Sequence, residues 1–416
     1  MSFQEQKRLN VLACAYGLAK NDVGESRMAF EWINRLSEFV NFQVITTGSR
    51  LHSVCGLEDN KHVKLIILKP HISFKRWDTF DRIVHPGYIE FFLRAYIVAR
   101  KLASQLSFDL CHHFTPRSLR YPSPLLNTGF PFIIGPIHGG LKPPSVMREL
   151  EGKEEGFLKL RLFDELRLRY DMLLRRHYDK TKRIIVSAPY VQDILPLQYR
   201  GKCMVISPPP PYDIEIRSHK AGKPGGRVNI LQMIYVGRLV PSKGLELLLL
   251  AMAKCQSRNI KLIIFGRGSQ EECYRKMVQR LGINDKVVWK GFVPHEKVVK
   301  AYIDADIFAF PSVKEPTGIA LTEAMASGLP ILCVDSGGPA YIVTDGCGVK
   351  VALSTKDKMV ADFAKAIDVL TNDPALREGM GKKARNRIRQ EFTWDFAIDK
   401  MRKLYDEIGI EKQQQE

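Results

Sequence analysis

Short apolar runs alternate with longer amphipathic segments along almost the whole chain, and this alternation restricts the fold more than any other feature. Runs such as 10–15 and 260–265 are too short for buried helices and predict buried strands. The segments 26–39 and 88–106, in contrast, carry apolar residues at helical spacing. Strands that alternate with helices form βαβ units around a parallel sheet, so the sequence predicts an α/β fold.

A run of four prolines, Pro208–Pro211, interrupts this pattern once. Such a run enters neither a helix nor a central strand, and a Gly- and Lys-rich stretch at 219–227 follows it. At ~100–200 residues per domain, 416 residues suffice for two domains or more. We predict two α/β lobes with a cleft between them, 1–206 and 207–394, and a C-terminal helix, 395–416, that joins the first lobe.

The chain is basic, with 63 Lys and Arg against 45 Asp and Glu and a formal net charge of +18. This charge favours anionic partners: nucleic acid, an acidic membrane face or phosphorylated small molecules. The N-terminus lacks the apolar core of a signal peptide, and no run approaches the ~18–20 apolar residues of a spanning helix. The eight cysteines form no CxxC pair, so we expect neither a zinc site nor disulfides, and a cytoplasmic protein.

Four segments of the second lobe combine strand ends with chemically useful side chains. In the first, a strand ends at Gly237, and Arg238 and Lys243 lie on the turn that follows. Two cations on a turn before a helix suit a diphosphate, because Arg offers a fork of donors and Lys a compact charge. An exposed basic loop would have the same sequence.

The second and third segments are glycine-containing turns. Gly266 and Gly268 follow a strand and precede a helix, and glycine lets a backbone approach a ligand closely. Phe292 lies in the turn 290–294, whose amides could meet the edge of a base. Each turn, taken alone, is equally compatible with an ordinary connection.

The fourth segment, 315–330, places two carboxylates around the start of a helix. Glu315 lies on the loop before the helix and Glu323 on its second turn, which suggests hydroxyl binding or acid/base chemistry. The positive end of the helix dipole at Gly318 and Ile319 favours a phosphate. Two solvated charges at a helix start are the alternative.

In their order and spacing, these segments resemble the motifs of retaining GT-B glycosyltransferases of the large family four group (glycosyl transferases group 1). The pattern Glu-Pro-x-Gly-x-x-Leu-x-Glu in 315–323 resembles the E-x7-E motif of that family. The resemblance covers 230–400 well and the first lobe loosely. It implies two Rossmann-like lobes facing a central cleft, with the acceptor in 1–206 and the nucleotide sugar in 207–394.

The resemblance also implies roles for single residues. Arg238 and Lys243 would hold the donor diphosphate, Glu315 the sugar hydroxyls and Glu323 the ribose. Thr317 replaces the aromatic residue most common at its position. The donor-binding set implied in this way is Gly24, Gly237, Gly266, Gly268, Phe292, Thr317, Gly318, Ile319, Ala320 and Glu323.

In the first lobe, three histidines are candidates for the active site. His112 and His113 are expected to follow a strand and to lie on the acceptor side. His138 is flanked by glycines that permit close approach, so we favour it as the catalytic histidine beside Arg238, Lys243 and Glu315. A structural hydrogen-bonding role is the alternative for each histidine.

The implied reaction moves a sugar from a nucleoside diphosphate, UDP more than GDP, to a hydroxyl of a glycan, a glycolipid or a glycosylated natural product. We expect retention of configuration, no metal and no cofactor beside the nucleotide sugar. Two other functions stay open: a sugar-nucleotide epimerase of similar fold and a nucleic-acid-binding protein. A phosphorylase would need pyridoxal phosphate.

The segment Lys159–Arg183 contains nine Lys and Arg residues against four acidic ones, with apolar residues at helical spacing. A basic amphipathic helix can lie on the anionic inner face of a membrane. We favour the alternative, an apolar stripe that faces the core and a solvated basic face.

Overall fold

The computed structural model describes residues 8–22, 24–47, 56–69, 86–150, 163–210 and 230–414. The chain divides into two compact units. Unit 1 comprises the described residues within 1–140, 156–211 and 394–416, and unit 2 those within 141–155 and 212–393. Pro211, the stretch 219–227 and the beginning of the basic segment, 159–162, lie outside the described residues.

Unit 1 is built on a seven-stranded sheet of parallel strands in the order β3-β2-β1-β4-β5-β6-β7. Its strands are β1 (Asn10–Ala15), β2 (Asn41–Thr46), β3 (Val63–Ile67), β4 (Leu110–Thr115), β5 (Phe132–Ile137), β6 (Thr181–Val186) and β7 (Cys203–Val205). Successive residues of β1 point to opposite faces: Val11 and Ala13 enter one core, and Leu12 and Cys14 enter the other. Burial of both faces explains why this strand is uniformly apolar.

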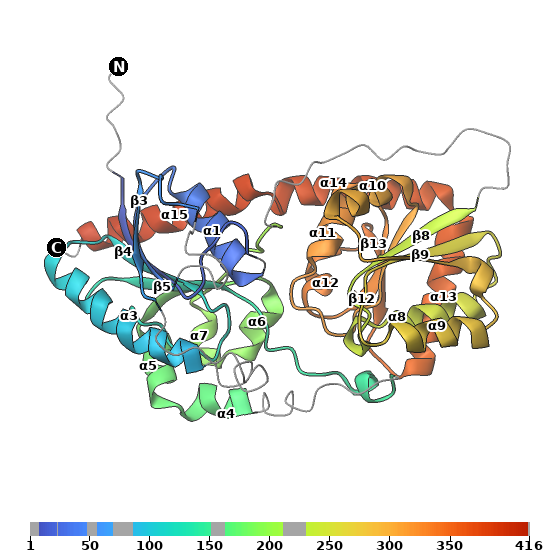
Figure 1. Ribbon diagram of the computed structural model, residues 1–416, viewed down its shortest axis with the longest axis horizontal. Coiled ribbons are helices and arrows are strands. Elements are labelled where there is room, and N and C mark those ends of the chain that lie inside the picture. The colour runs from blue at the N-terminus through green and yellow to red at the C-terminus, as the bar shows by residue number, and fades with distance from the viewer. Residues whose placement is uncertain are drawn as a thin grey trace, which may run out of the picture. The chain divides into compact units, whose positions relative to one another are not determined.

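Helices cover both faces of this sheet (Figure 1). They are α1 (Glu25–Leu36), α3 (Pro86–Gln105), α4 (Phe163–Tyr170), α5 (Met172–Lys180), α6 (Pro189–Ile194), α7 (Leu197–Arg200) and α15 (Trp394–Gln413). The C-terminal helix α15 packs beside α1 on one face, where the Trp32 and Trp394 rings meet edge to face at 5.2 Å. The helices α3 to α7 contribute to the core on the other face.

Unit 2 repeats this architecture with a six-stranded parallel sheet in the order β10-β9-β8-β11-β12-β13. Its strands are β8 (Leu231–Val236), β9 (Ile260–Phe265), β10 (Val287–Gly291), β11 (Ile307–Phe310), β12 (Ile331–Asp335) and β13 (Gly348–Ala352). Its helices are η1 (Ser145–Arg148), η3 (Pro241–Lys243), α8 (Leu245–Lys254), α9 (Glu271–Arg280), η4 (Asn284–Lys286), α10 (His295–Asp304), α11 (Ile319–Ala326), α12 (Gly337–Ile342), α13 (Lys356–Asn372) and α14 (Pro374–Glu391). The strand order reverses between β8 and β11, and open α/β sheets bind ligands at such a point.

A short segment from the first half of the sequence belongs to unit 2. Val146, Met147 and Leu150 are buried in the core that α8 and α13 cover, and Glu149 accepts a hydrogen bond from the Lys356 amide at 2.9 Å. The sequence-based division at 206/207 did not separate this segment from the first lobe.

The predicted α/β fold class is confirmed, and most predicted strands lie within two residues of the observed ones. Two local predictions were wrong. His112 and His113 lie inside β4 and do not follow it. The described part of the basic segment forms two helices and the start of β6, and Asp171 caps the start of α5 by accepting hydrogen bonds from the amides of Leu173 and Leu174. The edge strand β13 was not predicted.

The described residues contain neither a helix suited to span a membrane nor a cluster of metal-binding side chains. None of their helices is both long and apolar enough to cross a bilayer. None of their His, Cys, Asp and Glu side chains form a group of three or more that could hold a metal ion.

A buried hydrogen bond between Tyr405 of α15 and His112 of β4 joins this helix to the sheet of unit 1. Removal of the Tyr405 hydroxyl should therefore lower the stability of the protein. His112 Nε2 donates to the Gly135 carbonyl at 3.0 Å, so Nδ1 accepts from the Tyr405 hydroxyl at 2.6 Å. Burial lowers the pKa of His112 to about 3, which keeps the ring neutral. Tyr405→Phe leaves Nδ1 without a donor and should cost about 1–3 kcal/mol of unfolding free energy.

Denaturant titration of wild type and variant measures this loss. Tyr170→Phe is the matched control, because the Tyr170 side chain is exposed on α4. Equal stability of the two variants would contradict the assigned role of the Tyr405 hydroxyl.

Candidate functional site

The carboxyl ends of β8, β9 and β10 are joined through their backbones. The Gly237 amide donates to the Phe265 carbonyl at 3.0 Å, and the Gly266 amide donates to the Gly291 carbonyl at 2.8 Å. A side chain at Gly266 would collide with the Gly237 carbonyl oxygen, and one at Gly268 with the Leu239 carbonyl. These two glycines therefore let protein loops approach each other, a role that differs from the ligand approach expected from the sequence.

The two predicted cations lie on the turn after β8. Arg238 is exposed, and its carbonyl accepts a hydrogen bond from the Tyr235 hydroxyl at 3.0 Å. Lys243 ends η3 and is followed by Gly244, which has a left-handed backbone (φ +65°) and starts α8. The turn thus places one exposed guanidinium and one partly buried ammonium beside the switch point of the sheet.

Lys243 forms an ion pair with Glu315, which the loop after β11 supplies. The ammonium contacts Oε2, and Oε1 accepts hydrogen bonds from the amides of Gly318 at 3.0 Å and Thr317 at 3.3 Å. The Glu315 carbonyl accepts from the Gly338 amide at 2.9 Å. This one residue therefore connects the turn after β8, the start of α11 and the start of α12.

The remaining donor-side candidates surround this pair. Gly318 (φ +81°) caps α11, so the amides of Ile319 and Ala320 begin the helix and have no intrahelical acceptor. Phe292 follows β10 directly, and its side chain is 77% exposed. A chain of hydrogen bonds and ion pairs thus links the predicted segments at one edge of the sheet.

Glu323 lies on the second turn of α11, as predicted, and is largely buried. Its Oε2 accepts a hydrogen bond from the buried Tyr302 hydroxyl of α10 at 3.1 Å. Burial raises the pKa of Glu323 to about 8, so the carboxyl is mostly protonated at neutral pH. Sequence reasoning missed Tyr302, whose apolar spacing on α10 indicated only a core position.

Unit 1 brings its own candidates together at the carboxyl ends of β1, β4 and β5. Gly24 (φ +66°) precedes α1, and a Cβ on it would meet no atom within 4 Å. Glu25 Oε2 accepts from the Arg117 amide at 3.2 Å, and Glu25 Oε1 lies 3.7 Å from His138 Nε2. The His138 amide donates to the Arg117 carbonyl at 3.0 Å, so three chain segments meet at this cluster.

Electrostatics in this cluster depend on the buried Arg117, which sequence reasoning did not single out. Its Nε donates to the Pro136 carbonyl at 2.7 Å. Burial lowers the pKa of Arg117 to about 10, against the opposing effect of Glu25. Burial and the Arg117 charge lower the pKa of His138 to about 3, so its imidazole is neutral at physiological pH.

The two other histidines are enclosed in the core of unit 1. Both ring nitrogens of His112 are engaged inside the protein, and His113 Nδ1 lies 3.1 Å from Ser123 Oγ. Burial lowers the pKa of His113 to about 4. Their positions within β4 correct the expectation that both histidines follow the strand, and the two hydrogen bonds of His112 give that residue a structural role.

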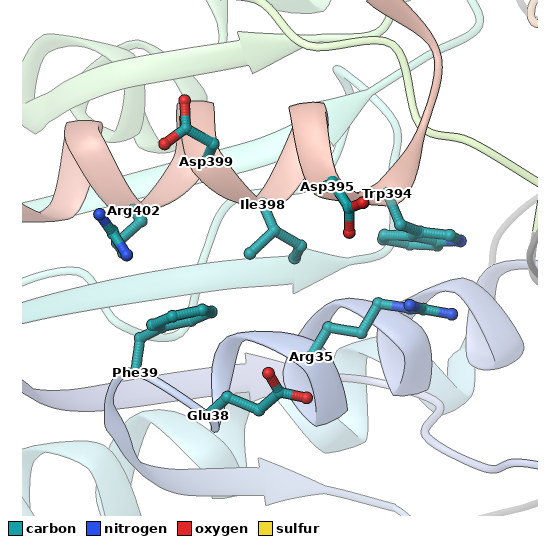
Figure 2. A pocket seen from close by; sticks show the side chains of 8 residues that line it. All are labelled: Arg35, Glu38, Phe39, Trp394, Asp395, Ile398, Asp399 and Arg402. Atoms are coloured by element: carbon teal, nitrogen blue, oxygen red, sulfur yellow. The ribbon is translucent and has the colours of Figure 1, made fainter. Parts of the chain in front are cut away.

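A separate hollow lies in unit 1 between the end of α1 and the start of α15 (Figure 2). Its arginines lie over aromatic rings, Arg35 over Trp394 at 4.9 Å and Arg402 over Phe39 at 5.1 Å. The residues that line it are Arg35, Glu38, Phe39, Trp394, Asp395, Ile398, Asp399 and Arg402. None of them belongs to the predicted site, and these contacts tie two helices together.

Comparison with known proteins finds similar sequences for part of the second half of the chain. Residues 220–387 match the family model Glycosyl transferases group 1. An uncharacterized glycosyltransferase of Methanocaldococcus jannaschii is 34% identical over 165 residues, 39% of this chain and 41% of that protein. The D-inositol 3-phosphate glycosyltransferase of Corynebacterium diphtheriae is 33% identical over 186 residues, 43% of either protein. The matched part thus spans less than half the length of these relatives.

Solved structures extend the likeness to the whole chain. The structure of Anabaena HepE in complex with UDP superposes with a TM-score of 0.62 at 16% identity, over 96% of this chain and 100% of that one. At this identity the match shows the fold, which is that of the GT-B glycosyltransferases.

The raised pKa of Glu323 predicts a pH-dependent stability. The folded state holds a proton that the unfolded state releases near pH 4.5, so wild-type stability should fall as pH rises from about 4.5 to 8. Glu323→Gln keeps an acceptor for the Tyr302 hydroxyl but cannot ionise, so its stability should fall less over this range.

The measurement is the unfolding midpoint of wild type minus that of the variant, at pH values from 5 to 8. This difference should become more negative as pH rises. Glu378→Gln, at an exposed position on α14, should give a constant difference. A constant difference for Glu323→Gln as well would show that the carboxyl ionises normally.

Proposed function

We propose that the chain is a retaining glycosyltransferase, because residues 220–387 match the family model Glycosyl transferases group 1. It moves a sugar from a nucleoside diphosphate, UDP in preference to GDP, to a hydroxyl of a glycan, a glycolipid or a glycosylated natural product. The observation that carries the proposal is the convergence of Arg238, Lys243 and Glu315 at the ends of β8 and β11. The comparisons favour neither the epimerase nor the nucleic-acid-binding alternative.

The donor diphosphate is bound by Arg238 and Lys243 in this proposal. A lysine ammonium has three N–H donors, so Lys243 can keep its contact with Glu315 and still donate to a phosphate. The exposed Arg238 adds a forked pair of donors. Fixed cations of this kind stabilise the charge that develops on the leaving diphosphate, which is usually the largest single contribution to catalysis.

Transfer breaks the bond between the anomeric carbon and the oxygen of the leaving phosphate. The acceptor oxygen bonds to the same face of that carbon, and its proton passes to the leaving phosphate. This scheme requires no enzymic base, no metal ion and no cofactor besides the nucleotide sugar.

The carboxylates select the sugar and the nucleoside. Glu315 is held in one orientation by Lys243 and the Gly318 amide, and we assign it to the donor-sugar hydroxyls. Glu323 is assigned to the ribose. Because its carboxyl is mostly protonated at neutral pH, it can donate one hydrogen bond to a ribose hydroxyl and accept another. The amides at the start of α11 would face the phosphates or the sugar.

The cluster in unit 1 serves the transferred sugar and the acceptor. A neutral His138 can donate or accept a hydrogen bond without adding positive charge beside the acceptor hydroxyl. Gly24 offers open space above its Cα, where a β-phosphate could approach the amides of α1.

Ligand-induced stabilisation tests the proposal. UDP at one hundred times its Kd should raise the unfolding midpoint of wild type by roughly 5–10 °C. Arg238→Ala and Lys243→Ala should lose most of this rise, and with donor and acceptor present each should lose about 10²–10³ in turnover.

Lys254→Ala is the matched control, since this exposed lysine lies at the C-terminal end of α8, whereas Lys243 lies just before its N-terminal end. GDP and ADP, measured in parallel, rank the bases. Wild-type-like stabilisation and turnover in both Arg238→Ala and Lys243→Ala would overturn the assignment of the diphosphate site.

A further inference from the structure

Helix α3 carries apolar side chains on its outer face as well as its inner one. Tyr88, Phe91 and the alanines at 95 and 99 are buried in the core of unit 1. Ile89, Leu93 and Ile97 recur every four residues on the opposite side and are 52%, 57% and 67% exposed. Monomeric proteins rarely expose contiguous apolar side chains, and such groups often mark interaction sites. The outer face of α3 therefore has the character of a contact surface.

The neighbouring helices α4 and α5 add a second exposed apolar group. Leu168, Leu174 and Tyr178 point into the same core as the inner face of α3. The exposed members are Leu166 (53%), Tyr170 (64%), Met172 (84%) and Leu173 (44%). They flank the corner at Asp171, and they include three side chains of the apolar stripe that we had expected to face the core.

Helices α3 and α5 lie side by side in unit 1 (Figure 1). Asn127 bridges the helices: its Nδ2 donates to the Tyr96 hydroxyl of α3 at 3.2 Å. Its Oδ1 accepts from Lys180 Nζ of α5 at 2.7 Å and from Arg176 at 3.3 Å. Both helices also contribute buried side chains to the same core. We call the seven exposed apolar residues the α3–α5 face: Ile89, Leu93, Ile97, Leu166, Tyr170, Met172 and Leu173.

Basic side chains accompany this face. Exposed cations on the same helices are Arg100, Lys101, Arg167, Arg169, Arg175, Arg176 and Lys180. Among the acidic residues described here, Glu90 is paired with Arg94 at 3.0 Å, and Asp171 with Arg167 at 2.9 Å. Tyr199 donates a hydrogen bond to Asp179 at 2.8 Å. With Asp164 and Glu165 of α4 included, α3, α4, Asp171 and α5 carry eight Lys and Arg residues against five acidic ones, a net charge of +3.

We propose that the α3–α5 face docks unit 1 onto the surface of an anionic lipid bilayer. The exposed aliphatic side chains and Met172 enter the boundary between headgroups and acyl chains, and the surrounding arginines and lysines contact the lipid phosphates. A second copy of the chain fits this face poorly, because two basic surroundings would repel each other. Docking is separate from the proposed function and does not depend on the identity of the sugar donor.

Vesicle co-sedimentation of the full chain tests this proposal. Wild type should sediment with vesicles of phosphatidylcholine and phosphatidylglycerol, less with phosphatidylcholine alone, and less as salt is raised. The double variant Leu93→Glu/Ile97→Glu should bind the anionic vesicles at least tenfold more weakly. Val369→Glu, at an exposed position on α13 of unit 2, is the matched control and should bind like wild type.

A spectroscopic variant reports the depth of insertion. Met172→Trp should show a blue-shifted emission maximum with anionic vesicles and no shift with phosphatidylcholine alone. Absence of wild-type binding to anionic vesicles, or equal binding by the double variant, would overturn the proposal. A dimer that the double variant abolishes, without vesicle binding, would identify the face as a contact between two copies instead.

Thermal stabilisation by nucleoside diphosphates distinguishes a failure of the membrane proposal from a failure of the proposed function. The double variant should keep the full rise in unfolding midpoint, because its substitutions lie in unit 1, whereas Arg238 and Lys243 belong to unit 2.

Discussion

The ion pair between Lys243 and Glu315 joins the ends of the two strands at which the sheet of unit 2 reverses its order, and the candidate site is organised around it. Glu315 also orients the first amides of α11, so the turn after β8 and the loop after β11 cannot move independently. Removal of one partner would leave a largely buried charge uncompensated, at a cost of about 3–5 kcal/mol. The same ion pair therefore stabilises the two loops and positions the side chains that we assign to binding of the nucleotide sugar.

The sequence predicted most of the fold because strands covered on both faces must be continuously apolar, and helices between them must be amphipathic. It failed where a partner distant in sequence makes a polar residue acceptable inside the protein. β4 contains His112 and His113. Burial lowers the pKa of His112 and keeps its ring neutral, and its hydrogen-bond partner Tyr405 lies almost three hundred residues later in the chain. No local pattern reveals such a partner, so the predicted strand ended too early.

The candidate site was predictable to a similar extent. Motifs identified Arg238, Lys243, Glu315 and Glu323, because their spacing relative to strand ends and glycines is visible in the chain. The interactions that set their chemistry were not visible. Glu323 is largely buried and hydrogen-bonded to Tyr302 from another helix, and Lys243 meets Glu315 across seventy-two positions of sequence.

The interleaved composition of the two units affects how the chain can be assembled. Unit 1 needs α15, whose Trp394, Met401 and Tyr405 complete one of its cores, yet this helix follows the whole of unit 2 along the chain. Unit 2 takes one early segment, described over 141–150, and its other residues end at 393, so its core can be buried before α15 is synthesised. Domains usually complete folding from the N-terminus onward during synthesis. Here the order is reversed, because unit 1 begins first in the sequence but can complete its core only after α15 has been synthesised.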